Sequence, residues 1–225
     1  MQSFPSRAAL AKALARDVAA ALSARLAVQV EAMLAVSGGS TPGLFFSELS
    51  QAALDWSRVA VTLVDDRWVP EDSPRSNAAL VRRHLFVNNA AAARFIPLYN
   101  GASSPQSGLA ALEAQFAQQP LSLAAAVLGM GEDGHTASFF PGGDRLARAL
   151  APVRGQNVEA LSAPNAGEPR ITLTLPVLIQ ADLLALHIEG EGKRQVLEKA
   201  LAGGPVEDMP VRAVLRHDPK IYWSP

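Results

Sequence analysis

The sequence of 225 residues contains no cysteine, which excludes disulfide bonds, thiolate metal sites and cysteine nucleophiles. It also lacks any apolar run long enough to span a bilayer. The N-terminal segment carries Arg7, Lys12 and Arg16 within an alanine-rich pattern, so it lacks the uninterrupted apolar stretch of a signal peptide. These absences lead us to expect a cytoplasmic protein with no membrane partner.

An excess of charge of either sign is also absent. Charged residues make up 18% of the chain and the formal net charge is -1. No strongly basic face is therefore expected, and nucleic acid is not expected as a partner. Hydrophobic residues reach 49%, which is enough for a sizeable core. An anionic ligand would have to be held by a few local cations.

Short apolar runs alternate with helical patterns along the chain. Strands are predicted at residues 32–36, 59–64, 123–128, 158–161, 171–175 and 183–188, and helices at 5–28, 78–86, 109–118 and up to 201. Several of these runs are apolar on both faces, which is typical of parallel strands covered by helices. We predict an α/β fold with three layers, a mostly parallel sheet flanked by helices. Since no linker or repeat interrupts the pattern, a single domain over residues 1–225 is expected.

Glycine-rich and charged segments follow several predicted strands, where ligands bind in open α/β sheets. After the first of them come two glycines and two hydroxyl residues, Gly38, Gly39, Ser40 and Thr41. Glycines let the backbone approach a ligand, and the helix start near Pro42 offers unpaired N–H groups to a phosphate. An ordinary strand-to-helix turn has a similar composition. A Walker A loop is excluded because no Lys-Ser or Lys-Thr pair follows.

Three charged residues, Asp65, Asp66 and Arg67, directly follow the predicted strand 59–64. Arg67 can hold a phosphate or carboxylate through two parallel hydrogen bonds. Asp66 would either hold Arg67 in place or act in acid–base chemistry, and we place both in the substrate site. The alternative is a solvated turn.

The segment from Gly129 to Gly134 matches the dinucleotide pattern G-x-G-x-x-G. That pattern should open a long helix, but Pro141 and the glycines after it stop any helix within about two turns. We interpret the segment as a loop that presents His135, whose neutral imidazole is suited to take a proton from water. Glu132 or Asp133 would orient that imidazole.

The other three histidines, His84, His187 and His217, are assigned no role, and His187 is expected to be a core residue. Lys193 follows two glycines near a predicted helix start, where a cation opposes the helix dipole unless an anion binds there. Arg170 precedes the strand 171–175 and is a further candidate cation, although both could simply be solvated.

Several chemistries have no motif in the chain. The sequence has no G-x-S-x-G elbow and no H-E-x-x-H or clustered set of metal ligands. What remains is a loop histidine, nearby carboxylates, a phosphate-type loop and a few cations. This inventory suits general-base attack of water on a phosphorylated substrate.

Taken together, the motifs resemble those of the 6-phosphogluconolactonases in the glucosamine-6-phosphate isomerase/6-phosphogluconolactonase family. The resemblance rests on S-G-G-S-T-P at 37–42, D-D-R-W-V-P at 65–70, S-N at 76–77, G-M-G-E-D-G-H-T-A-S-F-F-P-G at 129–142, R-I-T-L-T at 170–174 and G-K at 192–193. It implies a fold like those of glucosamine-6-phosphate deaminase and ribose-5-phosphate isomerase.

The resemblance also implies an activity, the hydrolysis of 6-phospho-D-glucono-1,5-lactone to 6-phosphogluconate in the oxidative pentose phosphate pathway. It implies no metal or organic cofactor, and a phosphorylated sugar lactone as the small-molecule partner. We expect a monomer.

Residue by residue, the resemblance makes His135 the group that activates water. Asp133, as a carboxylate that can orient the imidazole, is the second expected catalytic residue. Arg67 and Lys193 would contact the phosphate or the sugar acid, beside the 38–41 loop. Asn77 and Arg170 join the expected substrate-binding set. Family members usually have D-E-R where this chain has D-D-R, so Asp66 reaches less far than the usual glutamate.

Three other functions would use part of this set of motifs. The deaminases of the family resemble D-G-H-I-A-F-N-E-P after the corresponding strand, and Phe140 stands here in place of their glutamate. Ring opening needs proton transfers that a phenylalanine cannot make, which favours the lactonase. A phosphosugar-binding regulator would not need His135 and usually carries a DNA-binding helix pair. A nucleotide-dependent enzyme loses its support with the rejected dinucleotide pattern.

Overall fold

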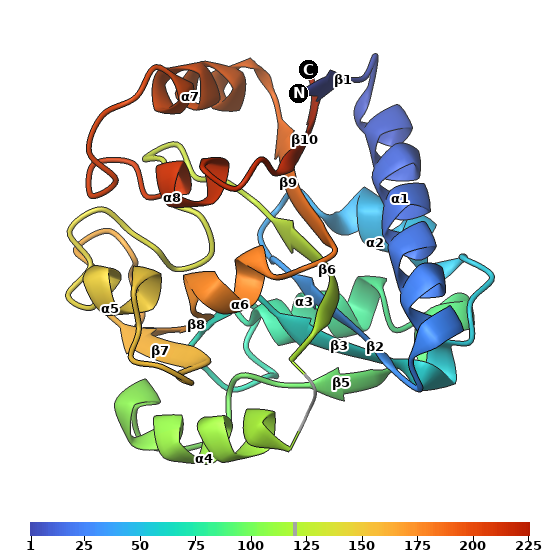
Figure 1. Ribbon diagram of the computed structural model, residues 1–225, viewed down its shortest axis with the longest axis horizontal. Helices are drawn as coiled ribbons and strands as arrows, with labels where there is room; N and C mark the ends of the chain where they lie inside the picture. Colours follow the sequence, from blue (N-terminus) through green and yellow to red (C-terminus); the bar gives the residue numbers. More distant parts are fainter. Residues whose placement is uncertain (119–120) are drawn as a thin grey trace.

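A parallel sheet of seven strands forms the centre of the computed structural model, which describes residues 1–118 and 121–225 (Figure 1). Its spatial order is β1 (Gln2–Ser3), β10 (Lys220–Ser224), β9 (Leu183–Glu189), β6 (Leu123–Leu128), β2 (Ala32–Val36), β3 (Val59–Leu63) and β5 (Arg94–Ile96). All residues of β2, β3 and β6 are buried. The predicted α/β fold with a mostly parallel sheet is confirmed.

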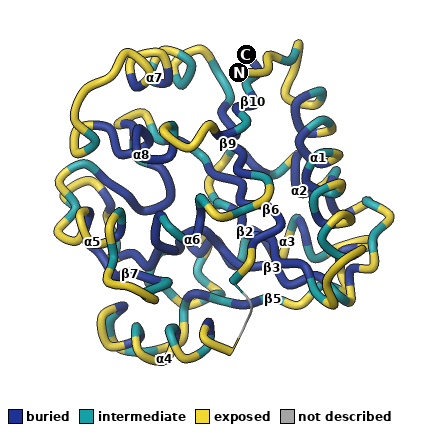
Figure 2. The backbone as a smooth tube through the Cα atoms, in the orientation of Figure 1, coloured by how far each residue is buried: buried dark blue, intermediate teal, exposed yellow. Residues whose placement is uncertain are grey.

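Helices flank this sheet. They are α1 (Arg7–Val28), α2 (Gly43–Ser50), α3 (Asn77–His84), α4 (Pro105–Ala117), α5 (Leu146–Leu150), α6 (Leu175–Ile179), α7 (Glu191–Leu201) and α8 (Val211–Leu215). The first of them shows how the layers hold together, because α1 buries Leu10, Leu14 and Val18 and packs against β2, β6 and α2. Figure 2 shows buried strands in the middle and exposed residues on the outer faces of the helices.

A second, smaller sheet was not foreseen from the sequence. It is antiparallel and consists of β4 (Asp65–Arg67), β8 (Arg170–Leu173) and β7 (Val158–Leu161). Residues 65–67 were expected to form a loop after the strand 59–64, and 158–161 and 171–175 to join the parallel sheet. Residues 65–67 form a strand because their backbone pairs with that of β8. Such backbone pairing does not depend on the polarity of the side chains. The strand of 171–175 ends at Leu173, since Pro176 fits the first turn of α6.

The order of the strands places a topological switch point between β2 and β6. From β2 the chain moves to β3 and β5 on one side, then returns to β6 and β9 on the other. Ligands of open α/β sheets bind outside the carboxyl ends of the strands at such a point. The loops that follow β2, β3, β6 and β9 therefore converge at one place.

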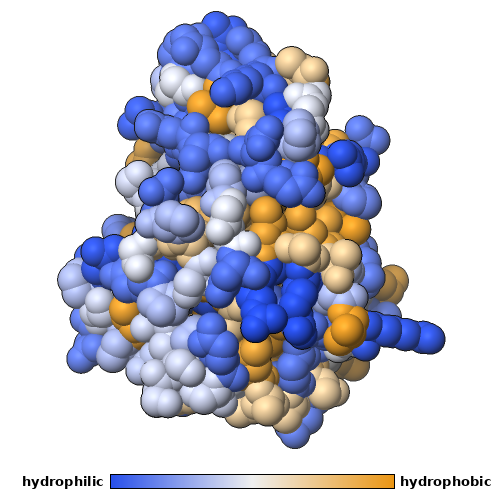
Figure 3. Space-filling view, turned by 90° about the vertical axis from the view of Figure 1, so that its left-hand side faces the viewer, coloured by the Kyte–Doolittle hydropathy of each residue, from blue (hydrophilic) through white to orange (hydrophobic). Residues whose placement is uncertain are grey.

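The two chain ends lie side by side, because β1 pairs with β10 (Figure 1). Across residues 1–118 and 121–225, no helix combines the length and the apolar character needed to cross a membrane. The face that carries α5, α7 and α8 is mostly hydrophilic, with an apolar region near its middle (Figure 3).

Candidate active site

A cavity of about 210 Å³ opens at the switch point, between the loops that follow β2, β6 and β9 and the strands β4 and β8. Most of the residues expected from the sequence line it, namely Gly38, Gly39, Ser40, Thr41, Arg67, Asn77, His135, Arg170 and Lys193. Two expected residues, Asp66 and Asp133, are not part of the lining. Each of them instead holds a residue that is.

His135 is held by Asp133 at the end of the loop that follows β6. Its Nδ1 atom lies 2.5 Å from Oδ1 of Asp133, which also accepts a hydrogen bond of 3.1 Å from the backbone N–H of His135. Burial alone would raise the pKa of Asp133, but the hydrogen bond and the charge of His135 outweigh it, and the pKa lies below its ordinary value. With the carboxylate at Nδ1, the nitrogen left for proton transfer is Nε2. Asp133, not Glu132, is therefore the orienting residue.

Two further contacts fix the imidazole ring. It stacks on the ring of Phe140, with centroids 4.2 Å apart and an angle of 29° between the planes. Gly131 lies under the ring, and a Cβ atom there would come within 2.2 Å of Cε1 of His135. The guanidinium of Arg170 also contacts Phe140, at 5.3 Å from the ring centroid. The phenylalanine thus lies in contact with both the candidate base and a candidate cation.

Arg67 and Arg170 stand opposite each other on the paired strands β4 and β8. Like charges at opposed positions of a sheet repel each other. Burial lowers the pKa of Arg170, and the charge of Arg67 lowers it further, while Asp65 acts in the opposite direction. Within the described part of the chain, the Nε atom of each arginine is buried and has no hydrogen-bond partner. An anion between the two side chains would relieve both the repulsion and the missing bonds.

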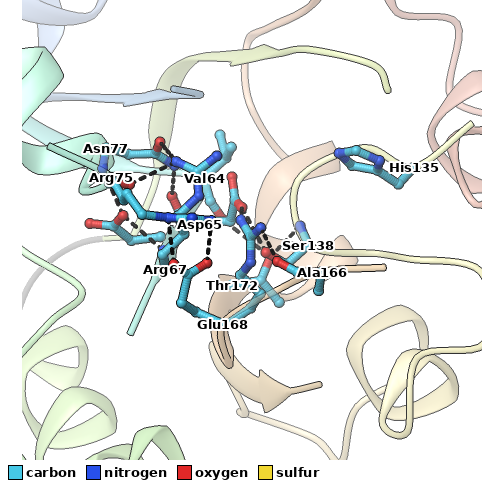
Figure 4. A network of polar contacts seen from close by, with 12 residues as sticks. Val64, Asp65, Arg67, Arg75, Asn77, His135, Ser138, Ala166, Glu168 and Thr172 are labelled. Carbon is cyan, nitrogen blue, oxygen red and sulfur yellow. Dashed lines mark hydrogen bonds and ion pairs between the residues drawn. The ribbon is translucent and has the colours of Figure 1, made fainter. Parts of the chain in front are cut away.

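Alternation along β4 explains why Asp65 lines the cavity and Asp66 does not. Successive side chains of a strand point to opposite faces, so Asp65 and Arg67 share the cavity face while Asp66 points away. Oδ2 of Asp65 accepts a 2.6 Å hydrogen bond from Ser138 and lies 3.9 Å from Arg170 (Figure 4). Asp65 was not expected to line the site, because residues 65–67 were expected to form a loop and not a strand.

Asp66 is fully buried behind this wall. It accepts hydrogen bonds of 2.8 Å from the backbone N–H groups of Arg67 and Asn77. Burial raises its pKa to about 6, against the lowering effect of these hydrogen bonds. Its place in the structure is that of a support for two lining residues.

Asn77, the first residue of α3, ties the wall to the glycine-rich loop. Its Nδ2 donates to the backbone carbonyl of Asp65 at 2.9 Å, and its Oδ1 accepts from Arg67 at 3.1 Å. A Cβ atom at Gly38 would lie 2.0 Å from that Oδ1. Only glycine at position 38 allows the loop to pass this close to the amide.

The other end of the cavity combines two helix starts with a lysine. Neither α2 nor α7 has a side-chain hydrogen bond at its N-cap, so their first N–H groups keep the donors that an anion can accept. Nζ of Lys193, in the first turn of α7, lies 3.4 Å from Oγ1 of Thr41. Burial lowers the pKa of Lys193, opposed by the charges of Glu189 and Glu132. Figure 4 shows His135 apart from the Asp65–Arg67–Asn77 network.

His187 is a lining residue to which the sequence gave no role. It is a core residue as expected, with 2% of its surface exposed, and its Nε2 lies 3.1 Å from Oε1 of Glu189. It nevertheless reaches the cavity wall. Its only sequence signal was its position in the strand that leads to Lys193. Over residues 1–118 and 121–225, no group of three or more His, Asp or Glu side chains is arranged to hold a metal ion.

Comparison with known proteins gives consistent matches over the whole chain. The family model described as glucosamine-6-phosphate isomerases/6-phosphogluconolactonase matches residues 5–223. A 6-phosphogluconolactonase of Rhizobium meliloti is 50% identical over 228 residues, covering 100% of this chain and 98% of the relative. One from Pseudomonas aeruginosa is 44% identical, covering 100% of this chain and 94% of the relative.

Solved structures give the same result. A 6-phosphogluconolactonase from Shewanella baltica superposes with a TM-score of 0.96 at 38% identity, covering 100% of this chain and 97% of that one. A monomeric glucosamine-6-phosphate deaminase gives a TM-score of 0.80 at 17% identity, covering 99% of this chain and 95% of that one. The second likeness concerns the fold alone, so chemistry has to be argued from the site.

Proposed function

The chain belongs to the glucosamine-6-phosphate isomerase/6-phosphogluconolactonase family, and from this membership we propose that it hydrolyses 6-phospho-D-glucono-1,5-lactone to 6-phosphogluconate, a step of the oxidative pentose phosphate pathway. The observation that carries the proposal is the His135–Asp133 pair, with Nδ1 and Oδ1 2.5 Å apart, at a cavity that also holds Arg67, Arg170 and Lys193. A histidine fixed in this way has one nitrogen free to act on water. The three cations suit a substrate that carries a phosphate and develops an oxyanion.

In the proposed reaction, the phosphate occupies the end of the cavity with Thr41 and Lys193. The lactone carbonyl then lies toward His135. Nε2 of His135 takes a proton from water as the water oxygen bonds to C1, and the carbonyl electron pair moves to the carbonyl oxygen. When that pair returns, the bond between C1 and the ring oxygen breaks. The imidazolium gives its proton to the ring oxygen, which becomes the hydroxyl of the product.

The oxyanion requires a donor on the same wall. Arg170 is the candidate, because its Nε atom is buried without a partner in the described residues. Its guanidinium also contacts the ring of Phe140, on which the His135 ring stacks. Preorganised donors of this kind contribute about 10²–10³-fold to acyl-transfer rates. General-base assistance by a histidine contributes about 10²–10⁴-fold.

Amino-sugar chemistry is the second candidate within the family, and Phe140 argues against it. Isomerisation with deamination needs a second group to move protons beside the histidine. The side chain stacked on His135 is a phenylalanine, which cannot ionise. The aromatic contact suits a site that only has to activate water.

The direct test is an assay with three substrates. We expect freshly prepared 6-phosphogluconolactone to be hydrolysed well above its spontaneous rate, glucosamine 6-phosphate to remain unchanged, and unphosphorylated gluconolactone to react with a much higher KM. Release of ammonia from glucosamine 6-phosphate, or equal kcat/KM values for the two lactones, would contradict the proposal.

A further inference from the structure

His187 is a buried titratable residue that the proposed reaction does not use. Its side chain forms part of the cavity wall with only 2% of the residue exposed. One ring nitrogen, Nε2, faces Oε1 of Glu189 at 3.1 Å. For the other, Nδ1, no hydrogen-bond partner is found among residues 1–118 and 121–225. Nδ1 is not among the side-chain atoms that are buried without a partner, so it keeps some accessible surface and is available to a ligand in the cavity.

The surroundings of His187 place it at the phosphate end of that cavity. Its ring packs edge-on against Phe45, with centroids 6.3 Å apart, in the helix that starts directly after the glycine-rich loop. On its other side, β9 continues through Gly190 into α7, which carries Lys193. His187 therefore lies between the two helix starts that offer free N–H groups.

Charged side chains approach His187 from two of the elements that pack around it. On its own strand it faces Glu189, whose side chain is only 9% exposed and which also contacts Arg7 of α1 at 3.3 Å. From α7, Lys193 is the nearby cation, and Glu189 raises its pKa against the effect of burial. The neighbour from α2, Phe45, carries no charge. The remaining neighbour, Tyr222 of β10, donates its hydroxyl proton to Asp17.

A neutral imidazole that donates Nε2–H to Glu189 has only a lone pair at Nδ1, which cannot bind a phosphate dianion. An imidazolium donates from both nitrogens, one to the carboxylate and one to the phosphate. We propose that His187 is a further substrate-binding residue, which takes up a proton from solvent as the phosphate binds and donates from Nδ1 to it while Glu189 holds Nε2. The inference rests on the proposed function for the identity of the phosphorylated ligand. The proton returns to solvent when the product leaves.

Calorimetric titration with 6-phosphogluconate tests the proton uptake. Binding is measured at pH 7 in two buffers that differ in ionisation enthalpy, for the unchanged protein and for His187→Gln. The matched control is His217→Gln, because His217 is exposed and does not line the cavity. We expect proton uptake to fall in His187→Gln alone, and its Kd to rise about tenfold to a hundredfold, as loss of a charge-assisted hydrogen bond implies. Any uptake by His135 is common to all three proteins and cancels in the comparison.

Kinetics give a second readout that a merely structural role would not move. We expect His187→Gln to lower about tenfold the ratio of kcat/KM for the phosphorylated lactone to that for gluconolactone. A parallel fall for both lactones, or proton uptake equal to that of the unchanged protein, would overturn the inference.

Should His187→Gln fail to fold, Glu189→Gln keeps the histidine but removes its carboxylate, and we expect the same loss of proton uptake. Unchanged proton uptake in Glu189→Gln would contradict the role proposed for the His187–Glu189 pair. Inorganic phosphate serves as a second probe, which separates the two proposals. If the protein binds phosphate through His187 but leaves 6-phosphogluconolactone untouched, the proposed reaction fails and the inference stands.

Discussion

At the scale of single residues, His135 is the side chain on which the proposed chemistry depends. We expect His135→Gln to lower kcat about 10²–10⁴-fold with little change in KM, because the base acts on water and not on the phosphate. Asp133→Asn should lower kcat less, since it keeps a hydrogen bond to Nδ1 but not the charge that stabilises the imidazolium. Steady-state kinetics on fresh 6-phosphogluconolactone measure both. A His135→Gln protein as fast as the unchanged one would remove His135 from the mechanism.

Phe140 gives a second prediction at this scale, concerning position and not chemistry. The 4.2 Å stack fixes the plane of the imidazole, so we expect Phe140→Leu to lower kcat about tenfold while KM changes little. Phe139→Leu is the matched control, because Phe139 is equally buried and adjacent in the chain. We expect both variants to lose stability and only Phe140→Leu to lose kcat. Equal kcat values for the two variants would show that the stack is only packing.

At the scale of elements, the loop after β2 and the start of α3 depend on one close approach. A methyl group at position 38 would lie 2.0 Å from Oδ1 of Asn77, so Gly38→Ala must displace that amide from Asp65 and Arg67. We expect KM to rise at least tenfold and the free energy of unfolding to fall by about 1–3 kcal/mol, the usual cost of overpacking.

Gly43→Ala is the control for this loop. Position 43 begins α2, and a Cβ atom there meets nothing within 4 Å. Alanine should be neutral or slightly stabilising, since it favours helix more than glycine does. A thermal melt and the KM of each variant complete the comparison. If Gly38→Ala bound substrate as well as Gly43→Ala, the contact with Asn77 would have no part in shaping the site.

The elements also show what the sequence could and could not predict. Buried parallel strands such as 32–36 and 123–128 carry their own signal, because every residue is apolar, and their predicted bounds agree with β2 and β6. The strand Asp65–Arg67 has no such signal. Its strand character comes from backbone pairing with a partner about a hundred residues away, which local propensity does not encode.

At the scale of the whole molecule, the site likewise contains residues that the sequence could predict and residues that it could not. Residues in glycine-rich loops after strands were predictable, because the fold brings those loops to one edge of the sheet. His187 and Asp65 reach the cavity from within strands, so only the packing of β9 against α2 and the pairing of β4 with β8 place them there. The proposal that the substrate is a lactone came from the motif resemblance. The residues that line the cavity argue only for a phosphorylated ligand and a histidine base.

The pH dependence of stability is a property of the whole molecule to which Asp66 makes a distinct contribution. Burial raises its pKa in the folded protein from 3.8 to about 6. Between those values the folded state binds more protons at Asp66 than the unfolded state does. The free energy of unfolding contributed by this group therefore decreases as pH rises from about 4 to about 6, opposite to the usual behaviour of a paired carboxylate.

The direction of this pH dependence can be measured by comparing the protein with Asp66→Asn, whose side chain does not titrate. A shift of about two pKa units corresponds to about 3 kcal/mol. We expect the free energy of unfolding of the unchanged protein, minus that of Asp66→Asn, to fall by about this amount between pH 4 and pH 7 in urea titrations. Asp72→Asn, at an exposed position nearby, provides the baseline. A difference that stayed flat or rose with pH would mean that the hydrogen bonds from Arg67 and Asn77 outweigh burial, and that Asp66 is held as a charged support at every pH at which the enzyme works.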